Sequence, residues 1–204
     1  MMISEKYLIK NYLQKRFSAK EIAAQAGCSV NKINYWLNKY AIPKRTISEA
    51  VYIKANPAGD PFLLRRPQSS EDWFLYGLGL GLFWGEGNKV NKHSVRLGNV
   101  DPALIRYFLL FLTTFYQVDK TKLRFGLQIF SDTSPETALN FWTKSLNVKA
   151  SSFHKKIIVS KSKKRGTYKR KSRYGVLTVY FSNSKLRDNI IDAIGKLQND
   201  QMPS

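Results

Sequence analysis

The stretch DWFLYGLGLGLFWGEGNK, residues 72–89, decides the fold of the larger part of this chain. Its apolar content and the potential capping residue Ser70 before it predict a helix, although four glycines lie inside it. These are Gly77, Gly79, Gly81 and Gly85. Each costs a helix interior roughly 0.8–1 kcal/mol relative to alanine, so we expect an offsetting gain. Gly77, Gly81 and Gly85 are four residues apart and share one side of the helix, where a second helix can approach closely.

One acidic residue, Glu86, stands near the end of this segment, and Gly87 follows it as a natural C-terminal stop. A carboxylate there faces the negative end of the helix dipole, which is unfavourable by a few tenths to about 1 kcal/mol. A divalent cation would offset this cost, because Mg²⁺ binds through one or two carboxylates together with phosphate oxygens. Glu86 is therefore a candidate ligand for Mg²⁺ or Mn²⁺. A surface glutamate on a core helix is the alternative.

The nine residues 79–87, GLGLFWGEG, resemble the motif of the LAGLIDADG homing endonucleases, with Glu86 at the last acidic position. The resemblance implies two such helices packed through small residues, whose terminal acids bind the divalent ions that cleave both DNA strands. The chain departs from the motif in having Glu instead of Asp at this position and Trp84 at the other acidic position. Because the chain contains one such helix, the resemblance implies a homodimer with Gly77, Gly81 and Gly85 at the interface. It also implies a basic residue that assists catalysis, for which Lys155 and Lys156 are the candidates.

The segments that follow have the element order of a LAGLIDADG domain, covering residues 71–200. Strands are predicted at 94–99, 123–130, 156–160 and 176–181, and helices at 103–116, 135–146 and 185–197. The implied fold is α+β, an antiparallel β saddle with packed helices, in which the helix at 135–146 is an addition. The major groove of DNA admits a two-stranded β-ribbon of such a saddle. Arg124 and Gln128 are the predicted base readers there, with Arg96 as a further DNA contact; solvent-facing polar residues are the alternative.

Residues 1–45 predict a small all-α helix-turn-helix module. Ser18 can cap a first short helix, Gly27 supplies the freedom a tight corner needs, and Ser29 can cap the second helix. The second helix of such a module enters the major groove and offers polar side chains to base edges. The predicted DNA contacts on it are Asn31, Lys32, Asn34, Tyr35 and Lys39. An ordinary pair of packed helices is the alternative.

A proline-rich basic linker is predicted over residues 46–70. Pro57, Pro61 and Pro67 prevent a long helix, although a short helix at 46–54 is compatible with them. Lys44 and Arg45, just before the linker, are predicted to contact the DNA backbone. A solvated connector is the alternative.

The chain has 34 lysines and arginines against 14 aspartates and glutamates, a formal net charge of +20. A surplus of this size attracts polyanions, of which nucleic acid is the commonest. The longest apolar run is too short to cross a bilayer, which takes about 20 residues. The single cysteine, Cys28, fits a reducing compartment, and no apolar signal-peptide core is visible at the N-terminus. We therefore expect a cytoplasmic, nucleoid-associated protein without a membrane partner.

Ten basic residues and no acid lie between His154 and Tyr174, which predicts a long loop that settles on phosphates. The predicted DNA contacts in this region are Lys161, Lys163, Lys164, Arg165, Lys169, Arg170, Lys171 and Arg173. Such a loop says nothing about sequence specificity. The net charge also does not distinguish DNA from RNA, so an RNA partner stays open.

The leading hypothesis is a metal-dependent endonuclease that cuts double-stranded DNA as a homodimer. The alternative is a non-catalytic transcription regulator that combines a helix-turn-helix with a LAGLIDADG-like DNA-binding domain. A retained Glu86 favours the enzyme, whereas the departures around it and the lack of a second evident acid favour the regulator.

Overall fold

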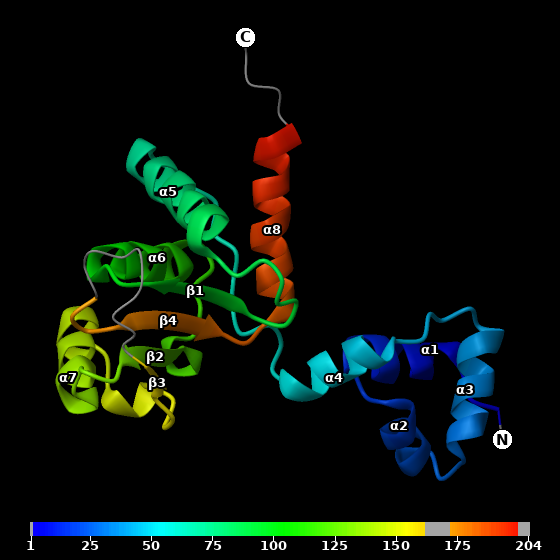
Figure 1. Ribbon diagram of the computed structural model, residues 1–204. Coiled ribbons are helices and arrows are strands. Elements are labelled where there is room, and N and C mark those ends of the chain that lie inside the picture. The colour runs from blue at the N-terminus through cyan, green and yellow to red at the C-terminus, as the bar shows by residue number, and fades with distance from the viewer. Residues whose placement is uncertain (1, 162–171, 200–204) are drawn as a thin grey trace. The chain divides into compact units, whose positions relative to one another are not determined.

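The computed structural model describes residues 2–161 and 172–199 and divides the chain into two compact units, Met1–Pro61 and Phe62–Ser204 (Figure 1). The boundary falls inside the linker predicted for residues 46–70. Each unit has its own hydrophobic core and is described by itself below.

The first unit is entirely helical. Its elements are α1 (Glu5–Leu8), the π-helical turn η1 (Ile9–Gln14), α2 (Ala19–Gln25), α3 (Val30–Lys39) and α4 (Ile47–Ala55). Ser18 caps α2 in a reciprocal capping box with Glu21, and the Ser29 side chain accepts a hydrogen bond from the Lys32 amide at the start of α3. Between these helices Gly27 takes a positive φ of 60°, as the tight corner requires. The helix pair predicted from these residues is confirmed.

A small core holds the helices of this unit together. Leu8, Ile22, Ile33 and Leu37 are fully buried in it. The helical segment from Glu5 to Gln14, which the sequence analysis did not predict, supplies part of this core. Helix α4 confirms the short helix expected at residues 46–54, but it has no buried residue.

The second unit is a mixed α+β domain. Its helices are α5 (Ser70–Glu86), α6 (Pro102–Phe115), α7 (Pro135–Leu146) and α8 (Ser184–Asn199), with the short turns η2 (Lys120–Lys122) and η3 (Ala150–Ser152). Its strands are β1 (Val95–Asn99), β2 (Arg124–Phe130), β3 (Ile158–Ser160) and β4 (Val176–Phe181). They form one sheet in the order β1-β4-β2-β3. The α+β class is confirmed.

The expectation of a fully antiparallel sheet is wrong. Strand β4 pairs antiparallel with both β1 and β2, but β3 runs parallel to β2 along the pairs Gln128↔Ile158 to Phe130↔Ser160. A parallel pair needs a long crossover, usually a helix. Helix α7 and the turn η3 lie between β2 and β3 in the chain and provide this crossover. The helix at 135–146, predicted as an addition, therefore accounts for the parallel pairing.

One face of the sheet is buried under the helices. The inward residues alternate along each strand, as Val95 and Leu97 do in β1 and Phe125 and Leu127 do in β2. They share one core with Leu80 and Phe83 of α5 and with the phenylalanines of α6. Helix α5 packs so closely on α6 that a Cβ at Gly79 would lie 2.1 Å from the Phe111 ring. Gly79 is thus required by packing inside the unit.

The chain that enters α5 is fixed to this unit. The Leu63 and Arg65 amides donate to the carbonyls of Tyr116 and Phe115, and the Arg65 guanidinium pairs with Asp72 at 2.7 Å. Ser69, not the predicted Ser70, caps the helix, because its hydroxyl accepts a hydrogen bond from the Asp72 amide.

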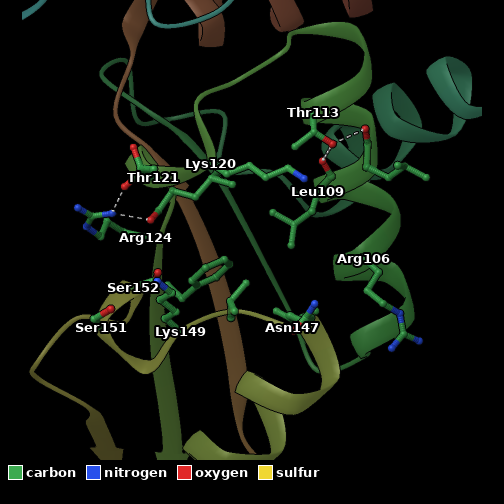
Figure 2. Close-up of a pocket in the computed structure, with 15 residues that line it drawn as sticks. Arg106, Leu109, Thr113, Lys120, Thr121, Arg124, Asn147, Lys149, Ser151 and Ser152 are labelled. Atoms are coloured by element: carbon green, nitrogen blue, oxygen red, sulfur yellow. Dashed lines mark hydrogen bonds between the residues drawn. The ribbon is translucent and has the colours of Figure 1, made fainter.

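A hollow opens on another side of the unit, between α6, the start of β2 and the turn after α7 (Figure 2). Within residues 2–161 and 172–199, no helix is long and apolar enough to cross a membrane.

Candidate nucleic-acid interface

Helix α3 of the first unit has a polar face opposite its buried one. Ile33 and Leu37 are buried, whereas Asn31 and Tyr35 are exposed. Lys39 is also exposed and lies over the Trp36 ring, with its ammonium 4.8 Å from the ring centroid. Of the other predicted contacts, Asn34 is half-buried, and Lys32 is half-buried where it lines a hollow with residues of the N-terminal segment. Asn31, Tyr35 and Lys39 are the most accessible of the predicted contacts on this helix.

Arg45 has a different environment from the one predicted. Its guanidinium stacks over the Tyr12 ring and donates to the backbone carbonyls of Tyr12, Arg16 and Phe17. These bonds satisfy carbonyls in the last turn of η1 and just after it, so the side chain holds the first unit together. Lys44, beside it, is exposed and remains a candidate phosphate contact.

The uncovered face of the sheet in the second unit carries aligned rows of side chains. Strand register places Arg96 of β1, Tyr180 of β4 and Arg124 of β2 in one row. The next row is Gly98, Thr178 and Gly126, and the row beyond it includes Val176 and Gln128. All of these residues are half-buried or exposed, in contrast to their buried neighbours along each strand. Two arginines and an aromatic ring in one row are suited to phosphates and bases.

The two glycines leave space for the neighbouring side chains. A Cβ at Gly126 would lie 2.8 Å from the Tyr180 ring, and one at Gly98 would lie 3.0 Å from the Thr178 hydroxyl. The Tyr180 ring therefore lies low over β2. Arg96 stacks on it at 5.2 Å, and the His154 ring meets it edge-on at 5.1 Å. Tyr180 was not among the predicted contacts, although the alternation of β4 places it on this face, and His154 is exposed.

Both predicted base readers lie on this face and also bind within the chain. Arg124 Nη1 donates to the carbonyls of Thr121 and Leu123 at 2.6 and 2.8 Å. Gln128 Nε2 donates to the Ser160 hydroxyl at 3.0 Å. Both side chains are exposed, so contact with bases would exchange these bonds at the surface.

Glu86 opens onto the same face. It is the last residue of α5, it is exposed, and it lines a hollow together with Lys89, Arg96, Thr178 and Tyr180. The end of the glycine-striped helix and the polar face of the sheet therefore share one concave surface. The cations beside the carboxylate are Lys89 and Arg96.

The predicted catalytic bases are elsewhere on the surface. Lys155 and Lys156 are exposed, but neither lines the hollow beside Glu86. Lys155 and Lys156 were predicted only because the resemblance implies a basic residue that assists catalysis. The resemblance assigned that residue to no particular position of this chain. Lys89 was missed, although it follows Glu86 by three residues. Its ammonium donates to the Trp84 carbonyl at 2.5 Å, which satisfies an unpaired group at the helix end.

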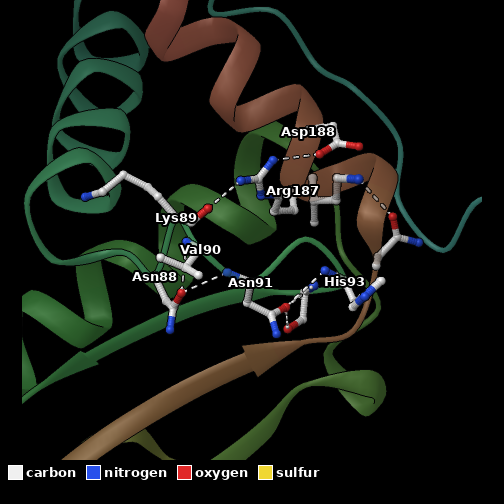
Figure 3. A network of polar contacts seen from close by, with 10 residues as sticks. Asn88, Lys89, Val90, Asn91, His93, Arg187 and Asp188 are labelled. Carbon is white, nitrogen blue, oxygen red and sulfur yellow. Dashed lines mark hydrogen bonds and ion pairs between the residues drawn. The ribbon is translucent and has the colours of Figure 1, made fainter.

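A hydrogen-bond network fixes the loop after Glu86 (Figure 3). The Asn88 side chain accepts bonds from the amides of Val90 and Asn91, and Asn91 in turn accepts from the amides of His93 and Ser94. From α8, Arg187 donates to the Lys89 carbonyl at 2.6 Å. The Asn88 amide also donates to the Arg96 carbonyl, which ties the loop to β1. The loop that lines one side of the hollow is thus held by its own hydrogen bonds, by β1 and by α8.

Of the described residues that line this hollow, Glu86 is the only acid, and none is a histidine or cysteine. Among residues 2–161 and 172–199, no group of three or more His, Cys, Asp or Glu side chains is placed to hold a metal ion. A single carboxylate is compatible with Mg²⁺ only where phosphate oxygens or a second chain complete the ligand set.

The outward side of α5 is apolar and has no partner within the described chain. Trp73 is 60% exposed, Phe74 is 70% exposed and Trp84 is 45% exposed. The predicted interface glycines, Gly77, Gly81 and Gly85, lie exposed among them, and an added Cβ at any of the three would meet nothing within 4 Å. The helix is therefore apolar on both its buried and its outward side.

The predicted basic loop falls mostly on residues that the structure does not describe. Lys163, Lys164, Arg165, Lys169, Arg170 and Lys171 lie outside the described residues. Lys161 and Arg173, at its two ends, are exposed, and Arg173 lies 5.4 Å from the Tyr174 ring.

No family model, no curated protein and no solved structure matches this chain.

Proposed function

We propose that this chain is a sequence-specific double-stranded DNA-binding protein that cuts DNA as a homodimer with a divalent metal. The observation that carries the proposal is the shared hollow in which Glu86 meets Arg96, Thr178 and Tyr180 of the open sheet face. A carboxylate next to a cationic and aromatic surface is placed where a phosphodiester backbone would lie.

Two surfaces support DNA as the partner. The exposed side of α3 offers amide, phenol and ammonium groups at Asn31, Tyr35 and Lys39, which suits base edges and phosphates in the major groove. The row of Arg96, Tyr180 and Arg124 offers a second such surface. The net charge of +20 favours a polyanion at both surfaces.

The outward side of α5 supports pairing of two chains. Trp73, Phe74 and Trp84 are large apolar groups that an isolated chain would leave in water. Between them the glycines at 77, 81 and 85 leave room for a second backbone. Two copies of α5 packed on this side would bring two Glu86 carboxylates toward one DNA site.

Glu86 would be the protein's metal ligand in each chain, together with phosphate oxygens of the bound DNA. A divalent ion held there would activate water and stabilise the leaving oxygen. The chain's own contribution is to present the carboxylate at the fixed end of α5. Arg96 and Lys89 are placed to bind the phosphates of the DNA beside it.

A non-catalytic DNA-binding regulator is the second candidate, and one observation favours it. Among the described residues that line this hollow Glu86 is the only acid, and Lys89 and Arg96 line it as well. A hollow with one carboxylate and two cations suits a phosphate backbone without a metal ion.

The deciding experiment incubates the purified chain with a random-sequence duplex library and scores bound and cut molecules separately. Parallel reactions contain Mg²⁺, Mn²⁺ or a chelator, and a matched single-stranded RNA library tests the RNA alternative. We expect one enriched duplex motif and cutting within it only when metal is present. Enrichment without cutting in either metal would leave the regulator. No duplex enrichment would contradict both candidates.

A further inference from the structure

The hollow between α6, the start of β2 and the turn after α7 lies apart from the residues assigned to DNA and metal, except for Arg124 (Figure 2). Its volume is 640 Å³, which is within the range of small-molecule sites. Leu109 and Leu110 of α6 form one wall, and Leu146 and Val148 form another. Leu123 and Phe125 contribute from the side of β2. Most of its lining is apolar.

Cations surround this apolar lining, and no acid does. Arg106, Lys120, Arg124 and Lys149 all line the hollow, and all four are exposed. Two other hollows of this unit differ, since Glu86 lines one and Asp132, together with Ser134 and Tyr174, lines the other. A general excess of basic residues therefore does not by itself explain the charge of this hollow.

Two of the four cations are already engaged by the chain. Arg106 donates to the Ser145 carbonyl, and Arg124 donates to the carbonyls of Thr121 and Leu123. For Lys120 and Lys149 the described structure contains no hydrogen bond or ion pair of the side chain. Figure 2 shows the Lys120 side chain extended across the hollow toward α6. These two ammonium groups are available to an anion.

The acid nearest to Lys120 in the sequence is held outside this hollow. Asp119 precedes Lys120, but its carboxylate accepts bonds from the Thr121 amide and hydroxyl at 2.9 and 2.7 Å. These bonds hold the pKa of Asp119 below its ordinary value. Its side chain does not line the hollow.

We propose that this hollow binds a small amphipathic anion, with an apolar body against the leucines and an anionic head at a free ammonium group of its rim, that of Lys120 or of Lys149. A purely inorganic anion would not be the best ligand for this apolar lining. A ligand with an apolar body gains roughly 25 cal/mol of binding free energy for each Å² of apolar surface that it buries. The free ammonium groups of Lys120 and Lys149 favour an anionic head over a neutral one, because a charged head forms charge-assisted hydrogen bonds with them. This proposal is independent of DNA cleavage and of pairing through α5.

The test is calorimetric titration of the full chain with three ten-carbon probes: decanoate, decyl phosphate and neutral decanol. We expect saturable binding of one anion per chain, and at least about tenfold weaker binding of decanol. The tighter of the two anions identifies the head as a carboxylate or a phosphate. Thr113→Phe, which places a ring into the hollow, should abolish binding of both, with thermal unfolding recorded to show that the variant is folded.

Two double variants separate the local site from the field of a chain with a charge of +20. Lys120→Gln with Lys149→Gln removes the free ammonium groups and should weaken decanoate binding about tenfold or more, leaving decanol unchanged. Lys122→Gln with Lys144→Gln removes the same charge from neighbouring exposed positions that do not line the hollow, and should change binding by less than about twofold.

Three results would overturn the proposal. Equal loss in the two double variants would mean that only the net charge attracts the probe. Equal affinity for decanol and decanoate would remove the anionic head. If Thr113→Phe weakened duplex DNA binding as much as decanoate binding, the hollow would belong to the DNA surface.

Discussion

Helices α3 and α5 show two opposite ways of using an exposed helix surface. Helix α3 buries Ile33 and Leu37 and turns asparagines and lysine toward solvent. Helix α5 buries Leu80 and Phe83 yet exposes Trp73, Phe74 and Trp84 as well. The first surface is stable in water and suited to a polar partner. The second gains free energy only when something apolar covers it.

The two helices are also held in place differently. Helix α3 begins at a short turn with serine caps, which are local interactions, and its buried residues join a small core. Helix α5 is positioned by α6, through a contact so close that Gly79 has no room for a side chain. A change on α3 should therefore alter recognition without altering the fold, whereas changes on α5 should separate into packing, pairing and chemistry according to their side of the helix.

The largest expected effect is on chemistry at the end of α5. Under the proposed endonuclease function, Glu86→Gln keeps the shape of the side chain but removes the metal-binding charge. We expect cutting in Mg²⁺ to fall by more than about a hundredfold, beyond the 10–100-fold typical of residues that only support a ligand. Affinity for DNA without metal should hold or rise, because one negative charge near the phosphates is lost.

Glu71→Gln is the matched control for Glu86→Gln, since it removes a charge from the first turn of the same helix. Cleavage and gel-shift assays on one enriched duplex compare the two variants with the wild type. Equal cutting by Glu86→Gln and wild type would place the chemistry elsewhere.

The next effect concerns pairing through the outward side of α5. Gly81→Leu fills the space expected for a second backbone, and overpacking at an interface costs about 1–3 kcal/mol, so we expect roughly a hundredfold weaker dimerisation. Sedimentation with and without duplex DNA measures it. Ala55→Leu, an exposed addition on α4 that is smaller by one carbon, should leave the assembly unchanged. A wild-type chain that stays monomeric on its preferred duplex contradicts the pairing.

The two sides of α5 can be compared with one kind of substitution. Gly79→Ala forces the Phe111 ring to move and should lower the free energy of unfolding by about 1–3 kcal/mol. Gly81→Ala meets nothing within 4 Å and should raise it by up to about 1 kcal/mol, through better helix propensity. Urea unfolding of dilute protein measures both. If both variants changed the free energy of unfolding in the same direction, the two sides of α5 would be packed alike.

Local signals explain which features of these helices were predictable. Ser18, Gly27 and Ser29 lie within a few residues of the groups they bind, so they predicted the helix pair of the first unit correctly. The parallel pairing of β2 with β3 depends on where α7 returns the chain, and no short window contains that information. The same holds for Arg45, whose carbonyl partners lie about thirty residues earlier in the sequence.

The candidate site was predictable in part for the same reason. Glu86 was found because its place at a helix end is a local anomaly, and the structure bears out that it ends α5. Its neighbours Arg96, Thr178 and Tyr180 come from two strands joined only by register. Lys155 and Lys156 were chosen without that register. To predict which residues surround an acid at a helix end, the order of the strands in the sheet must be known, and sequence patterns do not contain that order.

A smaller effect is expected at the recognition surface of α3. Residues near the N-terminus of a recognition helix contact base edges, and one good contact is worth about 1–3 kcal/mol of discrimination. Asn31→Ala should therefore relax the preference at one base position about tenfold while the module stays folded. Asn38→Ala, the same change near the other end of the helix, should leave the preference intact. Library selection with each variant measures both, and identical motifs for wild type and Asn31→Ala would remove α3 as the reading element.

The smallest effect is a pH dependence of the caps that position the helix pair. Hydrogen bonds from the Ser18 backbone and hydroxyl, with a contribution from Arg45, hold the pKa of Glu21 below its ordinary value of 4.5. Because the folded pKa is lowered, this contribution to stability is fully present above pH 4.5 and is lost as the pH falls through the lowered value. Glu21→Gln keeps a capping amide but removes the titrating charge. Its unfolding free energy should thus fall less steeply on acidification than that of the wild type.

Urea titrations at several pH values, followed by amide resonances of α2, measure this slope for the first unit. Ser18→Ala is the companion variant, because it removes the hydroxyl that binds the carboxylate and should flatten the slope in part. It should also cost about 1 kcal/mol at neutral pH through loss of the cap. Parallel slopes for wild type and Glu21→Gln would show that the capping box does not control the acid sensitivity of this unit. The local caps would then be less important to α2 and α3 than the buried contacts of Ile22, Ile33 and Leu37. In that case α3, like α5, would be positioned mainly by packing.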